Sequence, residues 1–231
     1  MKSLIIASSV DRAGLRDASR VFLPEAAQLA RPWATAREMS WFVDCVAFER
    51  KSMSAWRLRR YLADRLAGLA DDIGPTVSLV AFLCHGWSTG IQFGFHLAHI
   101  ERLAKLLARL AVRDGLFRVV LYCCKNADGP EDGPEEIGPA TDGGFADLLR
   151  DQLSLCGIEA QVDAHKTSGH ATQNPHVVRF DPGCGIGGSW LVKPQSLLWS
   201  RWCARLHAEH DMLRYRYPLM SRAEIAGALT D

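Results

Sequence analysis

Residues 76–86 read TVSLVAFLCHG, and residues 117–124 read FRVVLYCC. Each stretch is mainly apolar until it ends at side chains that can do chemistry. Apolar runs of this length, rich in β-branched and aromatic residues, are typical of strands buried on both faces of a parallel sheet. Between them, apolar residues recur every three or four positions from Phe93 to Leu110, which predicts a helix. A strand, a helix and a second strand in this order predict two neighbouring parallel strands.

The same alternation of strands and helices extends along the rest of the chain. We expect further strands at 3–8, 41–48 and 158–164, with a helix as the alternative at 41–48. We expect further helices at 15–29, 54–72 and 144–157. This pattern predicts a layered α/β fold around a mostly parallel sheet.

The chain reads as a single domain. Its 231 residues contain no internal repeat and no long flexible linker, and 48% of them are hydrophobic. We expect a core of sheet and helices over 1–182. A Trp-rich helical C-terminal extension is expected over 183–231, with its tryptophans packed as core or forming a partner-binding face.

Charge and cysteine usage narrow the class of protein. Twenty-seven basic and 26 acidic residues leave a net charge of +1, which argues against a sequence-independent nucleic-acid binder. No apolar run approaches the roughly 18 residues of a membrane span, and the apolar start is too short for a signal peptide. Seven cysteines without framework spacing favour reduced thiols in the cytoplasm.

A nucleophile and a base follow the two central strands. His85-Gly86 come directly after one strand, and Cys123-Cys124 come directly after the next. In open α/β sheets, functional groups gather beyond the carboxyl ends of strands, and neighbouring strands lie roughly 5 Å apart. A thiol and an imidazole placed there can act on one substrate as nucleophile and general acid/base.

The motifs Leu83-Cys84-His85-Gly86 and Val120-Leu121-Tyr122-Cys123-Cys124 resemble the caspase-like superfamily of cysteine peptidases. That group includes caspases, metacaspases, gingipain-type enzymes and CHAT domains, which carry His-Gly after one strand and Cys after the next. The resemblance implies a three-layer α/β/α sandwich and a cysteine endopeptidase that needs no metal or cofactor. A protein or peptide substrate is the expected partner, with no nucleic acid and no membrane. Cys84 before the histidine and Lys125-Asn126 after the cysteines depart from the usual family pattern.

Two cysteines compete for the role of nucleophile. The family places a small residue before its reactive cysteine, which favours Cys124 over Cys123. Lys125 beside Cys124 also favours a thiolate. The backbone N–H groups of Gly86 and Cys124 are candidate donors to an oxyanion.

A second polar cluster spans residues 163–175 and follows another predicted strand. Asp163, His165 and His170 are candidate substrate-binding residues that form a wall of the pocket. Alternatively, they join His85 as ligands of zinc, which would make the protein a zinc-dependent hydrolase. The cluster also suits a turn-rich surface loop.

For the protein as a whole, a third possibility besides the peptidase and the zinc-dependent hydrolase is an inactive caspase-like scaffold retained for binding.

Residues 126–149 contain seven acidic residues and no Lys or Arg. The first part, up to 142, is expected to be a loop. If its carboxylates reach the pocket, a basic residue before the scissile bond is preferred. The alternative is a solvated connection that takes no part in the site.

Overall fold

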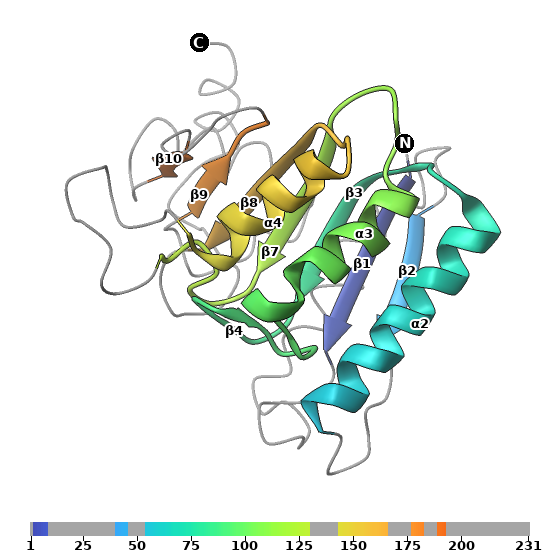
Figure 1. Cartoon of the computed structure of the whole chain (residues 1–231), viewed down its shortest axis with the longest axis horizontal. Coiled ribbons are helices and arrows are strands. Elements are labelled where there is room, and N and C mark those ends of the chain that lie inside the picture. Colours follow the sequence, from blue (N-terminus) through green and yellow to red (C-terminus); the bar gives the residue numbers. More distant parts are fainter. Residues whose placement is uncertain are drawn as a thin grey trace, which may run out of the picture.

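A seven-stranded, mostly parallel sheet forms the centre of the computed structural model (Figure 1). The structure describes residues 2–8, 40–45, 54–129, 143–165, 177–182 and 189–192. The strand order is β10-β9-β8-β7-β3-β1-β2. The strands are β1 (Lys2–Ser8), β2 (Ser40–Cys45), β3 (Val77–Leu83), β7 (Phe117–Tyr122), β8 (Ala160–His165), β9 (Val177–Phe180) and β10 (Ser189–Val192). Pairing is parallel from β2 through β8, whereas β9 is antiparallel to both β8 and β10.

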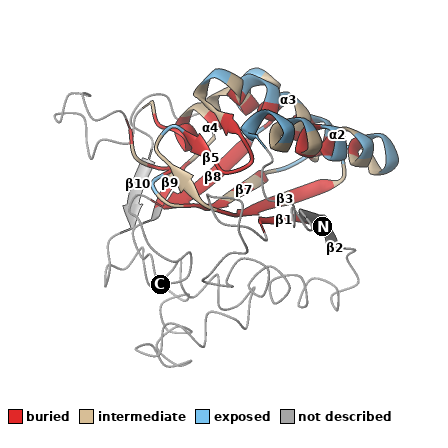
Figure 2. Cartoon of the chain, turned by 90° about the horizontal axis from the view of Figure 1, so that it is seen from below, coloured by how far each residue is buried: buried red, intermediate tan, exposed pale blue. Residues whose placement is uncertain are grey.

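Three helices, α2 (Ala55–Ile73), α3 (Ile100–Leu110) and α4 (Phe145–Leu155), lie on the same face of the sheet (Figure 2). The Ser54 side chain caps α2 by accepting from the Arg57 N–H at 3.4 Å. Gly74, at φ 63°, ends the helix in the left-handed region that glycine tolerates. Two of the three expected layers, sheet and one helix layer, are thus present among the described residues.

The core lies between these helices and the sheet. Alternate residues of β3 and β7 point to the helix side, which places Phe82 and Cys84 beside Leu121 and Cys123 in one apolar cluster. β3 is also buried on its other face, where Ala81 and Leu83 are at most 1% exposed. That double burial is what its mainly apolar sequence predicted.

Most predicted elements of the described residues are confirmed. The strands predicted at 3–8, 117–123 and 158–164 correspond to β1, β7 and β8, and the ambiguous stretch 41–48 contains strand β2 rather than a helix. β3 and β7 are parallel neighbours, with Leu83 opposite Tyr122. The helix expected at 15–29 lies outside the described residues.

The start of the central helix was predicted wrongly. Residues 86–96 form a small three-stranded sheet, β4 (Gly86–Trp87), β5 (Gly90–Ile91) and β6 (Phe95–His96), and η1 (Leu97–His99) leads into α3. Phe93 is buried, but from a turn, so its helical spacing was coincidental. Gly94 explains the break, because it has a φ of 77° and a side chain there would collide with the Ala55 carbonyl.

The sheet continues past residue 182, where the helical extension was expected to begin. Residues 189–192 form β10, and Trp190 pairs with Arg179 of β9. The remaining residues of the extension lie outside the described part. Within the segments that the structure describes, no helix combines the length and apolar character needed to cross a membrane.

Candidate active site at the carboxyl edge of the sheet

His85 and Cys124 lie at the same edge of the sheet, where β3 and β7 end. The last paired residues of these strands are Leu83 and Tyr122, so His85 and Cys124 each follow two residues beyond that pair. Parallel neighbouring strands lie about 5 Å apart. Both residues are partly exposed. The structure therefore places the two residues that the sequence analysis selected for chemistry at one edge of the sheet, beyond the ends of adjacent strands.

The two adjacent cysteines have different surroundings. Cys123 is 1% exposed, and its sulfur contacts the Cys84 sulfur at 3.4 Å and the Phe82 carbonyl at 3.7 Å. Cys124, one residue later, has left the core and is accessible. A nucleophile must be reached by its substrate, so this difference favours Cys124.

Gly86 is in close contact with the turn that carries the cysteines. A Cβ atom on Gly86 would lie 2.6 Å from Cys123 Cβ and 2.9 Å from the Cys124 carbonyl oxygen. Such distances are shorter than real Cβ contacts, so only glycine fits here without moving the backbone. The segment after β3 and the turn after β7 are therefore packed directly against each other.

Asn126 joins the same two segments, and the sequence analysis did not identify it as a site residue. It is fully buried, and its Nδ2 donates to the carbonyls of Trp87 at 2.7 Å and Gly90 at 2.8 Å. The neighbouring Lys125 has a φ of 58°, the only positive φ of a non-glycine residue in the described part of the chain. The available signal was a short amide side chain in a turn after a strand, which also fits an ordinary turn.

The backbone of His85 is fixed by Gln92. The His85 N–H donates to Gln92 Oε1 at 3.2 Å, and the Gln92 N–H donates to the His85 carbonyl at 2.9 Å. Because hydrogen-bonded and non-bonded pairs alternate along an antiparallel hairpin, the next pair, Gly86 and Ile91, occupies a non-hydrogen-bonded position. The Gly86 N–H therefore makes no hydrogen bond to the opposite strand of this hairpin.

His165 ends the next strand along and is buried at the same edge. Its carbonyl accepts from the Ala127 N–H at 3.0 Å, and its ring centre lies 6.0 Å from that of Tyr122. The edge thus carries His85, Cys124 and His165 on three consecutive strands, β3, β7 and β8. With an exposure of 2%, His165 supports the turn rather than presenting a surface.

Asp163 is engaged within the sheet. Arg179 of β9 lies opposite it and donates to both carboxylate oxygens, at 2.8 and 3.2 Å. This two-pronged pairing occupies the carboxylate that was a candidate for substrate or zinc. His170 lies outside the described residues. Among the residues described, no group of three or more His, Cys, Asp or Glu is arranged to hold a metal ion.

One carboxylate of the acidic segment is also committed elsewhere. Asp147, in the first turn of α4, is buried and lies 2.6 Å from the equally buried Arg150. It also accepts from the Gly143 N–H at 3.0 Å. The Asp147 carboxylate therefore stabilises the start of α4 and is not available to a substrate. Residues 130–142 of the acidic segment lie outside the described part.

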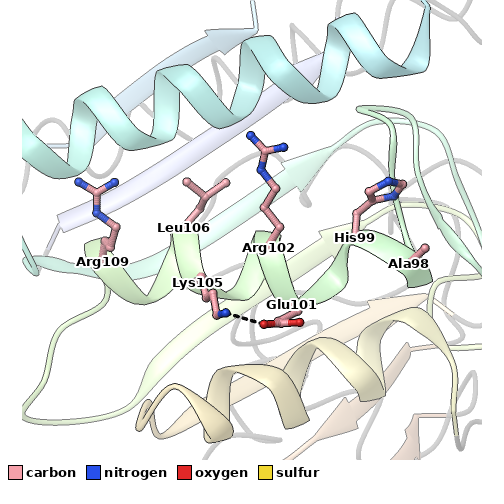
Figure 3. A pocket seen from close by; sticks show the side chains of 7 residues that line it. All are labelled: Ala98, His99, Glu101, Arg102, Lys105, Leu106 and Arg109. Carbon is pink, nitrogen blue, oxygen red and sulfur yellow. Dashed lines mark hydrogen bonds and ion pairs between the residues drawn. The ribbon is translucent and has the colours of Figure 1, made fainter.

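A separate cavity of about 470 Å³ lies along the outer side of α3 (Figure 3). Arg102 and Arg109 point toward α2, whereas the ion pair of Lys105 and Glu101 lies on the side of α4. Arg109 pairs with Asp71 of α2. None of the cavity's lining residues comes from the edge that carries His85 and Cys124.

The chain matches no protein-family model, no curated protein and no solved structure.

Proposed function

We propose that the protein is a cysteine peptidase that uses a Cys124–His85 dyad, in the manner of the caspase-like superfamily. The observation that carries the proposal is the placement of a partly exposed cysteine and a histidine beyond the ends of adjacent parallel strands. The close contact between Gly86 and the turn at Cys123 and Cys124 supports the proposal. The contact holds the segment after β3 directly against the segment after β7, with no side chain between them.

In the proposed reaction, the Cys124 thiolate attacks the carbonyl carbon of a peptide bond. The N–H groups of Gly86 and Cys124 stabilise the resulting oxyanion, for which the non-bonded hairpin position of Gly86 is suited. His85 donates a proton to the leaving amine as the C–N bond breaks. Water, deprotonated by His85, then hydrolyses the thioester and regenerates the thiol.

The proposal keeps a preference for Lys or Arg before the scissile bond. This preference rests on the segment 126–142, which contains several Asp and Glu residues and no Lys or Arg. Asp147 does not contribute to this attraction of a basic substrate residue, because its carboxylate forms an ion pair with Arg150. A positional peptide library is expected to show this basic preference and its weakening by salt. A preference for Asp, or a neutral preference unaffected by salt, would contradict the acidic loop's role and leave the dyad standing.

Covalent labelling tests the dyad directly. An acyloxymethyl ketone with a basic recognition residue is incubated with the full chain, and the modified residue is located by peptide mass spectrometry. We expect the label on Cys124, and its loss in Cys124→Ala. Cys123→Ala is the matched control, since it removes the neighbouring but buried thiol and should leave labelling intact. Labelling that persists in Cys124→Ala and disappears in Cys123→Ala would assign the nucleophile to the other cysteine.

The role of His85 is tested by turnover. His85→Ala should slow peptide hydrolysis roughly 10²- to 10⁴-fold, the usual contribution of general acid–base catalysis. Some alkylation of Cys124 should persist, because the thiol remains. Absence of both labelling and hydrolysis in a folded wild-type chain would favour the binding scaffold. Activity that is lost with chelators and restored by zinc would favour the hydrolase that uses zinc.

A further inference from the structure

Two core thiols lie directly before the proposed dyad. The sulfurs of Cys84 and Cys123 are 3.4 Å apart, and both residues are 1% exposed. They occupy matching positions on adjacent strands, one residue beyond the pair of Leu83 and Tyr122. Their side chains thus face each other across the gap between β3 and β7.

We propose that Cys84 and Cys123 are a redox-modification site that peroxide converts to a reversible disulfide. This inference does not depend on the proposed peptidase activity. In the reaction, two S–H bonds and the O–O bond of hydrogen peroxide break, one S–S bond forms, and two water molecules are released. The thiols lose two electrons to peroxide, and a dithiol reductant restores them.

The backbone geometry suits such a bond. A disulfide needs an S–S distance of about 2.05 Å and a Cα separation of about 4.4–6.8 Å. Neighbouring strands are about 4.8 Å apart, which falls in that range. The two sulfurs therefore need to approach by little more than an ångström, a movement that side-chain rotation supplies without shifting the sheet.

The location of the pair provides access for the oxidant. Both thiols lie at the end of the sheet, next to the turn that contains the partly exposed Cys124. Local opening of such a turn requires less free energy than unfolding of the sheet. The disulfide would join the residues immediately before His85 and Cys124, and so fix the two strand ends relative to each other.

Mass spectrometry of the intact chain tests this inference. The reduced protein is treated with hydrogen peroxide, remaining thiols are blocked with N-ethylmaleimide in urea so that buried thiols also react, and the chain is digested with trypsin without reduction. Cleavage after Lys and Arg places Cys84 in peptide 66–102 and both Cys123 and Cys124 in peptide 119–125. We expect these two peptides to be linked with the loss of two hydrogens, and dithiothreitol to separate them.

Variants assign the linked atoms. The link should form in the wild type and in Cys124→Ser, and should be absent in Cys84→Ser and Cys123→Ser. Cys156→Ser, which removes a thiol at the end of α4, is the matched control and should leave the link unchanged. A link that survives in Cys123→Ser but not in Cys124→Ser, or a folded wild type in which both thiols stay fully reactive to N-ethylmaleimide, would overturn the inference. Because the readout is a crosslink, it is separate from the labelling of Cys124 that tests the peptidase.

Discussion

At the scale of single residues, Gly86 decides whether the two segments of the candidate site can meet. We expect Gly86→Ala to destabilise the fold by about 1–3 kcal/mol, because the added methyl group overpacks a backbone contact. Probe labelling of Cys124 should fall with it, since relief requires the turn to move away from His85. Urea unfolding and labelling rates measure the two effects.

Gly68 provides the matched control. It lies within α2, and a Cβ there meets nothing within 4 Å. Gly68→Ala should therefore stabilise the protein by up to about 1 kcal/mol through helix propensity. Labelling of Cys124 should not change. Equal effects of the two substitutions would show that the contact at Gly86 has no special role.

The sequence was sufficient to place His85 and Cys124 at the ends of neighbouring strands, because a strand end is recognisable from an apolar run that stops at polar side chains. The sequence was not sufficient to find the hydrogen bonds of Asn126 or the ion pair that Asp163 forms with Arg179. Both depend on partners that are distant in sequence, Trp87 and Gly90 for one and Arg179 for the other. No local pattern contains such pairings.

At the scale of elements, the ion pairs within α4 test how far burial determines the contribution of a charge pair to stability. Asp147→Ala leaves the buried Arg150 with Asp151 alone, and we expect a loss of about 3 kcal/mol. Asp151→Ala removes the other partner, which is 44% exposed, and should cost at most about 1 kcal/mol. Chemical denaturation of both variants measures the difference. Equal losses would mean that burial does not determine the strength of these pairs.

The start of α3 should make stability depend on pH. Burial, with the nearby charges of Arg59, His96 and Arg102, lowers the pKa of His99 below its ordinary value. The unfolded chain then binds the proton more readily, so stability is lost as the pH falls from about 7 to 5. His99→Gln should reduce this loss, as measured by urea midpoints across that range. Parallel pH profiles for the two proteins would contradict this prediction.

Helices and strands with strong periodicity were predictable, and the segment between β3 and α3 was not. Its apolar residues happen to recur at helical spacing, but Gly90 and Gly94 approach other backbone segments so closely that extended strands and turns form instead. The approach is made to residues such as Ala55, far away in the sequence. Tertiary contact thus overrides local preference here.

At the scale of the whole molecule, the strand order explains why the candidate site forms where it does. β3 and β7 occupy the centre of the sheet, with β1 on one side and β8 on the other. Their carboxyl ends are therefore supported from both sides, and His165 of β8 holds the cysteine turn through Ala127. A site built on such strands is more rigid than one built on an edge.

A single continuous sheet predicts a single unfolding transition. β1 and β10 come from opposite ends of the described chain and belong to the same sheet, so no described strand can separate without breaking hydrogen bonds to its neighbours. Tryptophans are spread from position 33 to 202, whereas far-ultraviolet circular dichroism reports mainly the helices. We expect urea curves from fluorescence and circular dichroism to coincide, as they do for a two-state domain. Separated midpoints would instead divide the chain into independently folding parts and would contradict this prediction.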